Sequence, residues 1–222
     1  MTPAGLSVEV SDGALVTGAR AAAAAGIVVD LRRDAWGHGI DAGVRALLAA
    51  GVDRACVEPA DAPRLRAAGL HGVAPHGDSA VFYGLSAGAD PAMHASSCIL
   101  STKPLRAGEG VSYGYTHRAA ADTWIGLVAG GYGQGVARAL GNRISVCVEG
   151  RMCPVIGRIA MDVCVVDLGP DGSSVVPGAP VSLFGGDGPA RRSLDSWAEA
   201  TGWTRAELAG VIGACVPRRS VA

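Results

Sequence analysis

The chain reads Ile27-Val28-Val29-Asp30-Leu31 and continues at once with Arg32-Arg33-Asp34-Ala35-Trp36-Gly37-His38-Gly39. The apolar, β-branched run predicts a strand, and the two glycines that bracket His38 predict a tight turn after it. A helix with one apolar face is predicted next, formed by Ile40, Val44, Leu47 and Leu48. Residues 54–57 predict a second strand, which gives the strand, helix and strand order of parallel α/β structure.

The same pattern continues to about residue 85. Asp61 is expected to cap a short helix that carries Pro63 in its first turn and ends at Gly69. The run Ala80-Val81-Phe82-Tyr83 predicts another strand. We therefore expect an α/β domain over residues 1–85 and a second domain of different character over residues 86–222.

After residue 85 the pattern changes to short apolar runs separated by turn residues. These runs are Val146-Cys147-Val148, Pro154-Val155-Ile156, Val163-Cys164-Val165-Val166 and Val181-Ser182-Leu183. Their spacing predicts a small antiparallel barrel. Ser193 is expected to open a helix, and Thr204 with Glu207 forms a capping-box pattern for a last helix that ends near Gly210.

Composition limits the classes of partner. The 222 residues are 49% apolar and 18% charged, with a formal net charge of -1, which is ample material for a buried core and offers no basic surface for nucleic acid. No apolar stretch is long enough to span a bilayer, and no secretion signal precedes the first strand, so we expect a cytoplasmic protein. The six cysteines form no CxxC pair, which favours free buried thiols over a structural zinc site. The partner is expected to be a small molecule or another protein.

Four motifs in order carry a resemblance to a known family. They are Leu105-Arg106-Ala107-Gly108-Glu109-Gly110-Val111-Ser112-Tyr113-Gly114, Gly131-Tyr132-Gly133-Gln134-Gly135, Gly157-Arg158-Ile159-Ala160-Met161-Asp162 and Val216-Pro217-Arg218. In this order they resemble the C-terminal β-domain of alanine racemases. The resemblance implies that Tyr113 is a catalytic base, and it places Gln134 and Ala160 where aspartate and cysteine are common in the family.

The stretch from Ile27 to Gly39 also resembles a racemase segment, the one that carries the lysine which binds pyridoxal phosphate as a Schiff base. In this chain that position is Arg32, and the only lysine is Lys103. A guanidinium group stays protonated and is a poor nucleophile, so it cannot form the Schiff base. We therefore expect no cofactor and assign no cofactor-binding residue. The resemblance also puts Trp36, Gly77 and Ala214 where the family has residues that contact the phosphate or the pyridine ring.

The first 85 residues resemble a racemase barrel from which most of the middle strands are missing. Residues 8–15 resemble the first racemase strand and helix, residues 65–69 the end of the second barrel helix, and residues 83–85 the segment after the last barrel strand. A full (β/α)8 barrel typically needs about 250 residues. The expected fold class is therefore α/β plus β: a truncated remnant of the barrel, with about three parallel strands, packed with an alanine-racemase-like β-barrel domain.

The resemblance and the residue chemistry together nominate a site. Candidate catalytic residues are Tyr113, His38 and Asp162, and candidate substrate-binding residues are Trp36, Tyr132, Arg138, Arg158 and Met161. An unperturbed imidazole has a pKa of about 6.5, and a neighbouring arginine would favour the charged form of a tyrosine. For His38 the alternative is a structural role, in which the imidazole bonds the backbone of its turn. Tyr113 and Tyr132 could equally be half-buried sheet aromatics.

Three functional hypotheses follow, and we place the first narrowly ahead. The first is a cofactor-independent isomerase or cyclase that moves protons on a small molecule through Tyr113. The second is a non-catalytic binding or regulatory protein that pairs through its β-domain, for example with a full-length racemase. The third is alanine racemase activity by this chain alone, which would require Lys103 to enter the site. By analogy with the family, a homodimer is the expected assembly, with a heterodimer as the alternative.

Overall fold

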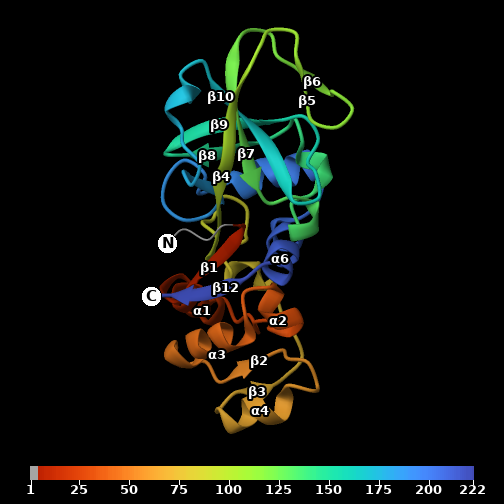
Figure 1. Cartoon of the computed structure of the whole chain (residues 1–222). Coiled ribbons are helices and arrows are strands. Elements are labelled where there is room, and N and C mark those ends of the chain that lie inside the picture. Colours follow the sequence, from red (N-terminus) through yellow and green to blue (C-terminus); the bar gives the residue numbers. More distant parts are fainter. Residues whose placement is uncertain (1–4) are drawn as a thin grey trace.

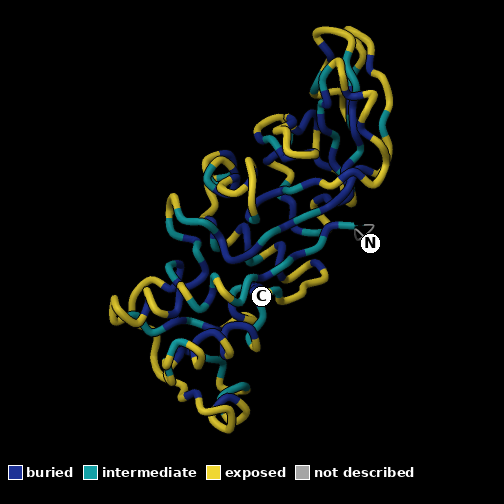
Figure 2. Tube along the Cα trace, turned by 90° about the vertical axis from the view of Figure 1, so that its left-hand side faces the viewer, coloured by how far each residue is buried: buried dark blue, intermediate teal, exposed yellow. Residues whose placement is uncertain are grey.

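A computed structural model describes residues 5–222 as an elongated molecule with a barrel at one end and a smaller helical part at the other (Figure 1). Buried segments run through the barrel and the middle of the molecule, and exposed segments lie mainly at both ends (Figure 2). The main hydrophobic core includes residues from both parts, such as Leu15 and Leu47 at one end and Val146 and Val166 at the other. The two parts therefore share one continuous core.

Six antiparallel strands close into the barrel predicted from the short apolar runs. In ring order they are β4 (Met93–Leu105), β7 (Thr123–Ala129), β10 (Val163–Gly169), β9 (Arg151–Ile156), β8 (Ser145–Val148) and β11 (Pro180–Phe184), and β11 pairs back onto β4. Along β10 the burial alternates strictly, as expected for a strand with one face in the core. A small hairpin of β5 (Gly110–Val111) and β6 (His117–Arg118) stands beside the barrel. The four predicted strands are confirmed.

Two further strands extend the sheet from β4. The strand β1 (Ser7–Ser11) pairs antiparallel with β4, and β12 (Arg218–Val221) pairs parallel with β1. The helix α1 (Asp12–Ala24) follows β1 directly, and the Ser11 side chain caps it by accepting the Ala14 N–H at 3.1 Å. The strand and helix expected for residues 8–15 are confirmed, and β1 joins them to the barrel sheet.

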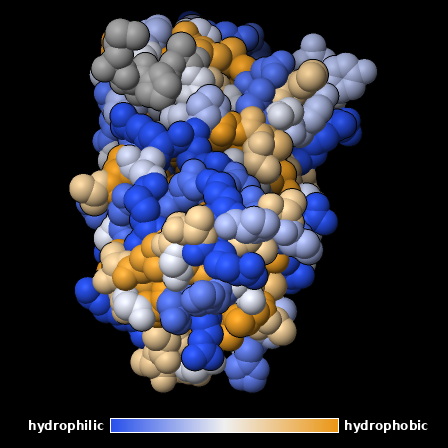
Figure 3. Space-filling view, turned by 90° about the horizontal axis from the view of Figure 1, so that it is seen from below, coloured by the Kyte–Doolittle hydropathy of each residue, from blue (hydrophilic) through white to orange (hydrophobic). Residues whose placement is uncertain are grey.

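The helical part contains three short parallel segments. Asp30 forms a parallel bridge with Cys56, next to β2 (Arg54–Ala55), and β2 pairs in parallel with β3 (His71–Gly72). The helices α3 (Ile40–Ala49) and α4 (Ala62–Ala67) lie at the positions that the sequence predicts, with Pro63 in the first turn of α4. Asp61 precedes α4 as expected, but its side chain makes no capping hydrogen bond. From that end, hydrophobic residues reach the surface between hydrophilic ones (Figure 3). The descent of this part from a barrel stays a prediction.

The strand predicted at residues 80–83 is wrong. Residues Ser79–Val81 form a 3-10 turn, which the side chain of Asp78 caps by accepting the Ala80 N–H at 2.9 Å. Phe82 and Tyr83 are fully buried without joining a sheet, and the Tyr83 hydroxyl donates to the backbone oxygen of Asp30 at 2.6 Å. The apolar run was misleading because burial, and not strand pairing, accounts for its aromatic residues. The third parallel segment is the exposed pair His71–Gly72, which carries no strand pattern.

The last two helices are α5 (Ser193–Thr201) and α6 (Arg205–Cys215). The capping box of Thr204 and Glu207 is present, but α6 continues beyond Gly210, so its predicted end was wrong. Gly210 and Gly213 allow α6 to pack against the turn at Gly37, because a Cβ at Gly213 would lie 2.2 Å from the Gly37 oxygen. These glycines serve close packing and not helix termination.

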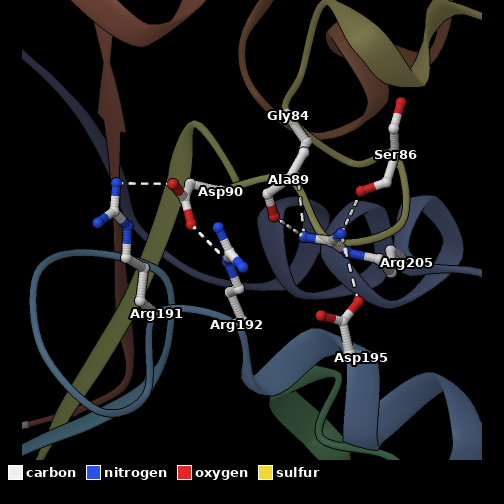
Figure 4. Close-up of polar contacts among 8 residues, drawn as sticks. All are labelled: Gly84, Ser86, Ala89, Asp90, Arg191, Arg192, Asp195 and Arg205. Atoms are coloured by element: carbon white, nitrogen blue, oxygen red, sulfur yellow. Dashed lines mark hydrogen bonds and ion pairs between the residues drawn. The ribbon is translucent and has the colours of Figure 1, made fainter.

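A buried arginine on α6 holds the connection between the two parts of the molecule. The side chain of Arg205 is 5% exposed, and its guanidinium donates to backbone oxygens of Ser86, Gly84 and Ala89 and lies 3.3 Å from the Asp195 carboxylate (Figure 4). Asp90, at the end of the same connection, pairs with Arg191 at 2.6 Å and with Arg192 at 3.0 Å.

No helix within residues 5–222 has the length and hydropathy that a membrane crossing would require. All six cysteines are free, as predicted, and five of them are buried, whereas Cys215 is exposed.

We expect Arg205→Ala to destabilise the fold by about 2–4 kcal/mol, because it removes the donors of several buried carbonyl groups and leaves a cavity. The matched control is Arg192→Ala, whose side chain is 60% exposed and which should cost less than about 1 kcal/mol. Urea unfolding followed by circular dichroism measures both. Equal losses in the two variants would contradict the role assigned to Arg205.

Candidate functional site

The turn after residue 31 has an unusual backbone. Arg33, Asp34, Ala35 and Trp36 all have positive φ values between 52° and 55°, which is a left-handed turn built without glycine. Such a conformation costs roughly 1–2 kcal/mol per residue in L-amino acids. It persists only where surrounding contacts hold it, and strained backbone of this kind concentrates at functional sites.

Asp34 and Arg218 hold this turn in place. The Asp34 carboxylate accepts the Ile40 N–H at 2.8 Å and the Arg218 guanidinium at 2.5 Å. Arg218 also donates to the backbone oxygens of Gly37, at 2.9 Å, and Gly213, at 3.2 Å. Arg218 of the Val-Pro-Arg motif, near the C-terminus, therefore stabilises a turn that lies near the N-terminus of the chain. Neither Asp34 nor Arg218 was among the residues nominated from the sequence.

His38 lies inside this turn and is 1% exposed. Its Nδ1 lies 3.2 Å from the Ala35 oxygen and 3.1 Å from the Trp36 oxygen, so Nδ1 carries the proton, and Nε2 has no partner among the described residues. Its ring lies 4.5 Å from that of Tyr83, which also stacks on Trp36 at 5.0 Å. Burial lowers the pKa of His38 to about 4. The expectation that His38 titrates near neutrality is wrong, and the structural alternative is supported.

Arg32 is bound by the residue two positions before it. Its Nε and Nη2 donate to the two oxygens of Asp30 at 2.9 and 2.8 Å, and its backbone N–H donates at 3.0 Å. Burial alone would raise the pKa of Asp30, but the hydrogen bonds from Arg32 outweigh it and lower that pKa. The same hydrogen bond raises the pKa of Arg32 above its usual value. Position 32 therefore carries a permanent cation paired to a carboxylate.

These residues do not fit a covalently attached pyridoxal phosphate. Lys103 lies near the C-terminal end of β4. Met93, at the N-terminal end of β4, packs on Gly213 beside the left-handed turn. Ten residues of strand span roughly 33 Å, so Lys103 cannot reach position 32. At Gly77, where the family resemblance expects an arginine, φ is +76° and a Cβ would lie 2.8 Å from Ile27. An arginine would be strained and crowded there.

A second group of nominated residues gathers at the 3-10 turn η2 (Tyr132–Gln134). The N–H of Tyr132 donates to the Ala160 oxygen at 3.0 Å, and Gln134 donates from Nε2 to the Asp162 carboxylate at 3.0 Å. The Arg138 guanidinium lies 5.3 Å from the centre of the Tyr132 ring, a cation–π contact. Tyr132, Arg138, Met161 and Asp162 are thus brought together.

Tyr113 lies on a neighbouring loop and is 83% exposed. Its neighbour Ser112 accepts the Arg158 N–H at 2.7 Å and donates to the Arg158 oxygen at 2.9 Å. The Arg158 guanidinium passes within 3.6 Å of the place where a Cβ of Gly114 would be. Arg158 and Met161 belong to one short segment, so the Tyr113 loop and the Tyr132 group adjoin. We call the exposed side chains of Tyr113, Tyr132 and Met161 the tyrosine face.

The helix α6 separates the tyrosine face from the turn that holds Arg32 and His38. On one side Gly213 packs on Gly37, and on the other Ile212 lies against Gly135. A helix with its side chains is about 10 Å across. The nominated residues therefore form two groups within one chain: Trp36 and His38 at the left-handed turn, and Tyr113, Tyr132, Arg138, Arg158, Met161 and Asp162 beyond α6.

Comparison with known proteins relates this geometry to one family. The family model described as alanine racemase, C-terminal domain, matches residues 92–220. The alanine racemase of Mycolicibacterium vanbaalenii is 41% identical over 128 residues, 58% of this chain and 33% of that protein, and that of Mycobacterium tuberculosis is 42% identical over 118 residues, 53% and 31%. The matched region spans about a third of the length of these curated relatives.

Solved structures share the fold over nearly the whole chain. The alanine racemase from D-cycloserine-producing Streptomyces lavendulae superposes with a TM-score of 0.85 and 21% identity, covering 100% of this chain and 98% of that one. The alanine racemase from E. faecalis gives a TM-score of 0.81 and 18% identity, covering 96% and 97%. At these identities the likeness shows a common fold alone.

The depressed pKa of His38 gives a prediction for stability. Because the folded state keeps the imidazole neutral down to about pH 4, its contribution is complete above about pH 6.5 and is lost as the pH falls toward 4. We expect His38 to account for a loss of about 2 kcal/mol in unfolding free energy between pH 7 and pH 5. Urea unfolding of His38→Gln should lack this part of the pH dependence. The exposed His71→Gln control should retain it, and equal behaviour of both variants would refute the assignment.

Proposed function

This chain belongs to the alanine racemase family, and from that premise we propose that it is a member without covalent pyridoxal phosphate which acts by pairing its tyrosine face with a second chain of the same fold. One observation carries the proposal: α6 separates exposed Tyr113 from the turn where Arg32 is paired to Asp30 and His38 is buried. Within residues 5–222, one chain therefore has no enclosed site that combines these groups. A second chain could complete either half.

The exposed surface supports pairing through the tyrosine face. Tyr113 is 83% exposed, Met161 58% and Tyr132 45%, although large apolar or aromatic side chains are usually covered. A homodimer is the simplest assembly, and it would bring the tyrosine face of one copy to the left-handed turn of the other. A heterodimer with a full-length racemase would instead bring Tyr113 to a site that has its own lysine.

A cofactor-independent isomerase or cyclase is the second candidate, with a small molecule as its substrate. Two contacts favour it: Tyr132 lies in a cation–π contact with Arg138, and the Tyr113 loop lies against Arg158. They gather tyrosine hydroxyls and guanidinium groups, which can bind a polar small molecule, on one exposed surface. The burial of His38 removes the proposed partner for proton transfer, so the pairing role comes first.

We expect pyridoxal phosphate to form no stable covalent adduct with this protein. Borohydride reduction in the presence of pyridoxal phosphate, followed by peptide mass spectrometry, should leave residues 27–45 unmodified. The variant Arg32→Lys provides a reactive amine at the same position and calibrates detection. A saturable, stoichiometric adduct on Lys103 would refute the proposal. Turnover by cofactor-free protein that disappears in Tyr113→Phe would favour the second candidate.

We expect Met161→Glu to weaken self-association at least 10-fold, because it places a charge in an apolar interface. Sedimentation analysis over a range of concentrations measures the change. The matched control is Val176→Glu, since Val176 is 59% exposed and lies in the connection between β10 and β11, across the barrel from β5 and β6 (Figure 1).

The control variant should associate like the unmodified protein. Equal association of both variants would rule out the tyrosine face as the interface. If the unmodified chain is monomeric alone, binding to a full-length alanine racemase that Met161→Glu abolishes would support the heterodimer. Absence of both assemblies would refute the pairing role.

A further inference from the structure

Three polar side chains form a line across the outer face of the sheet, away from the tyrosine face. Glu9 on β1 is paired in register with His94 on β4, and Ser182 lies on β11, the strand on the other side of β4. The Ser182 hydroxyl lies 2.5 Å from His94 Nε2, and Glu9 Oε2 lies 4.0 Å from His94 Nδ1. A hydroxyl, an imidazole and a carboxylate thus follow one another in the order that nucleophilic serine sites use.

The two ring nitrogens of His94 have distinct neighbours. Nε2 faces the serine and Nδ1 faces the carboxylate, so the tautomer with its proton on Nδ1 leaves Nε2 free to accept the serine proton. The 4.0 Å separation is longer than a hydrogen bond, and such contacts are often loose before a substrate binds. Glu9 is itself oriented by an ion pair with Arg219 on β12. Each member of the line is therefore held by a neighbouring strand.

The backbone beside His94 fixes the position of its ring. A Cβ at Gly186 would lie 2.9–3.0 Å from three ring atoms of His94, so only glycine allows the turn after β11 to pack on the imidazole. In residues 5–222 the backbone N–H groups of Gly186 and Asp187 have no acceptor. These N–H groups belong to the turn that packs on the His94 ring, and free backbone N–H groups are the kind of donor that stabilises a developing oxyanion.

A cavity of about 460 Å³ opens beside His94 and Glu9 and is accessible to solvent, and Ser182 contacts His94 without lining it. His94 and Glu9 line it, with 29% and 28% of their side chains exposed, together with Asp90, Asp187 and Arg191. Arg191 pairs with Asp90 and Glu9 pairs with Arg219, so among the described residues that line the cavity Asp187 is the carboxylate without an ion pair to an arginine. The volume and charge suit a small neutral or cationic molecule.

We propose that Ser182, His94 and Glu9 form a second, hydrolytic site whose substrate is a small neutral or cationic carboxylic ester. The Ser182 oxygen attacks the ester carbonyl carbon while His94 Nε2 takes the serine proton. The bond to the alcohol breaks, and the departing oxygen takes that proton from His94. Water, deprotonated by His94, then releases the carboxylic acid and restores the serine. Glu9 lies in the stretch 8–15 that resembles the first racemase strand, whereas His94 and Ser182 lie outside the four quoted motifs. None of the three belongs to the tyrosine face, so this site does not depend on the pairing proposal.

A fluorophosphonate probe tests the proposal on the whole chain. The Ser182 oxygen should displace fluoride from phosphorus, and peptide mass spectrometry should locate the adduct on Ser182. Ser182→Ala should abolish labelling, and His94→Gln should slow it at least about 100-fold. The matched control is Ser96→Ala, because Ser96 is the register partner of Ser182 on β4 and has no histidine contact. That control should label at the unmodified rate, with an unchanged circular dichroism spectrum in all three variants.

The pH dependence of labelling supplies a readout that a structural role would not give. Burial lowers the pKa of His94, while Glu9 and Asp187 oppose this shift, and Arg219 and Arg191 flank these acids. The labelling rate should therefore rise with pH to a plateau, with a midpoint below about 6.5. Glu9→Gln should lower the midpoint further and slow labelling. Absence of an adduct on Ser182, or an unchanged rate in His94→Gln, would overturn the proposal.

Discussion

The left-handed turn from Arg33 to Trp36 is the constraint on which the rest of the structure depends. Four consecutive residues without glycine occupy a costly backbone region, and they remain there because Asp34 and Arg218 tie the turn to the far end of the chain. Arg218 is available because β12 pairs with β1, which leads into α1. The turn, the edge of the sheet and the close packing of α6 therefore form one cooperative unit.

This unit also decides which chemistry the turn can perform. Carbonyl oxygens at Ala35 and Trp36 point at His38 Nδ1, and the aromatic rings of Tyr83 and Trp36 exclude water, so the histidine is a neutral structural element. Arg32 is held by Asp30 and cannot act as an amine. Because α6 fills the space beside the turn, it separates the tyrosine face from Arg32 and His38.

The strand β4 organises the other half of the molecule. Its residues 93–96 pair with β1, its residues 99–105 pair with β7, and β11 pairs with residues 95–98, so it links the closed barrel to the helical part. Its alternating side chains place Met93 and Ala95 in the core and His94 on the outer face. The barrel interior is filled with apolar residues and includes the buried thiols of Cys153 and Cys164, whereas the histidine and the carboxylate paired with it lie on the outer face. The line of Glu9, His94 and Ser182 follows from that arrangement.

The sequence by itself determined the elements with strong local patterns: the barrel strands β8, β9, β10 and β11, the helix α3, the capping box before α6, and the motifs of the racemase C-terminal domain. It also showed that position 32 lacks an amine. The strands β4 and β7 were not predicted, and α1 was expected only from the family resemblance. Only the tertiary structure decided that residues 80–83 are buried without pairing, that Gly210 and Gly213 serve packing, and that His38 is sealed from water. Local sequence patterns indicate periodicity and helix capping. The burial of a residue, the pKa of His38 and the separation of the tyrosine face from the left-handed turn by α6 instead arise from contacts between segments far apart in the chain.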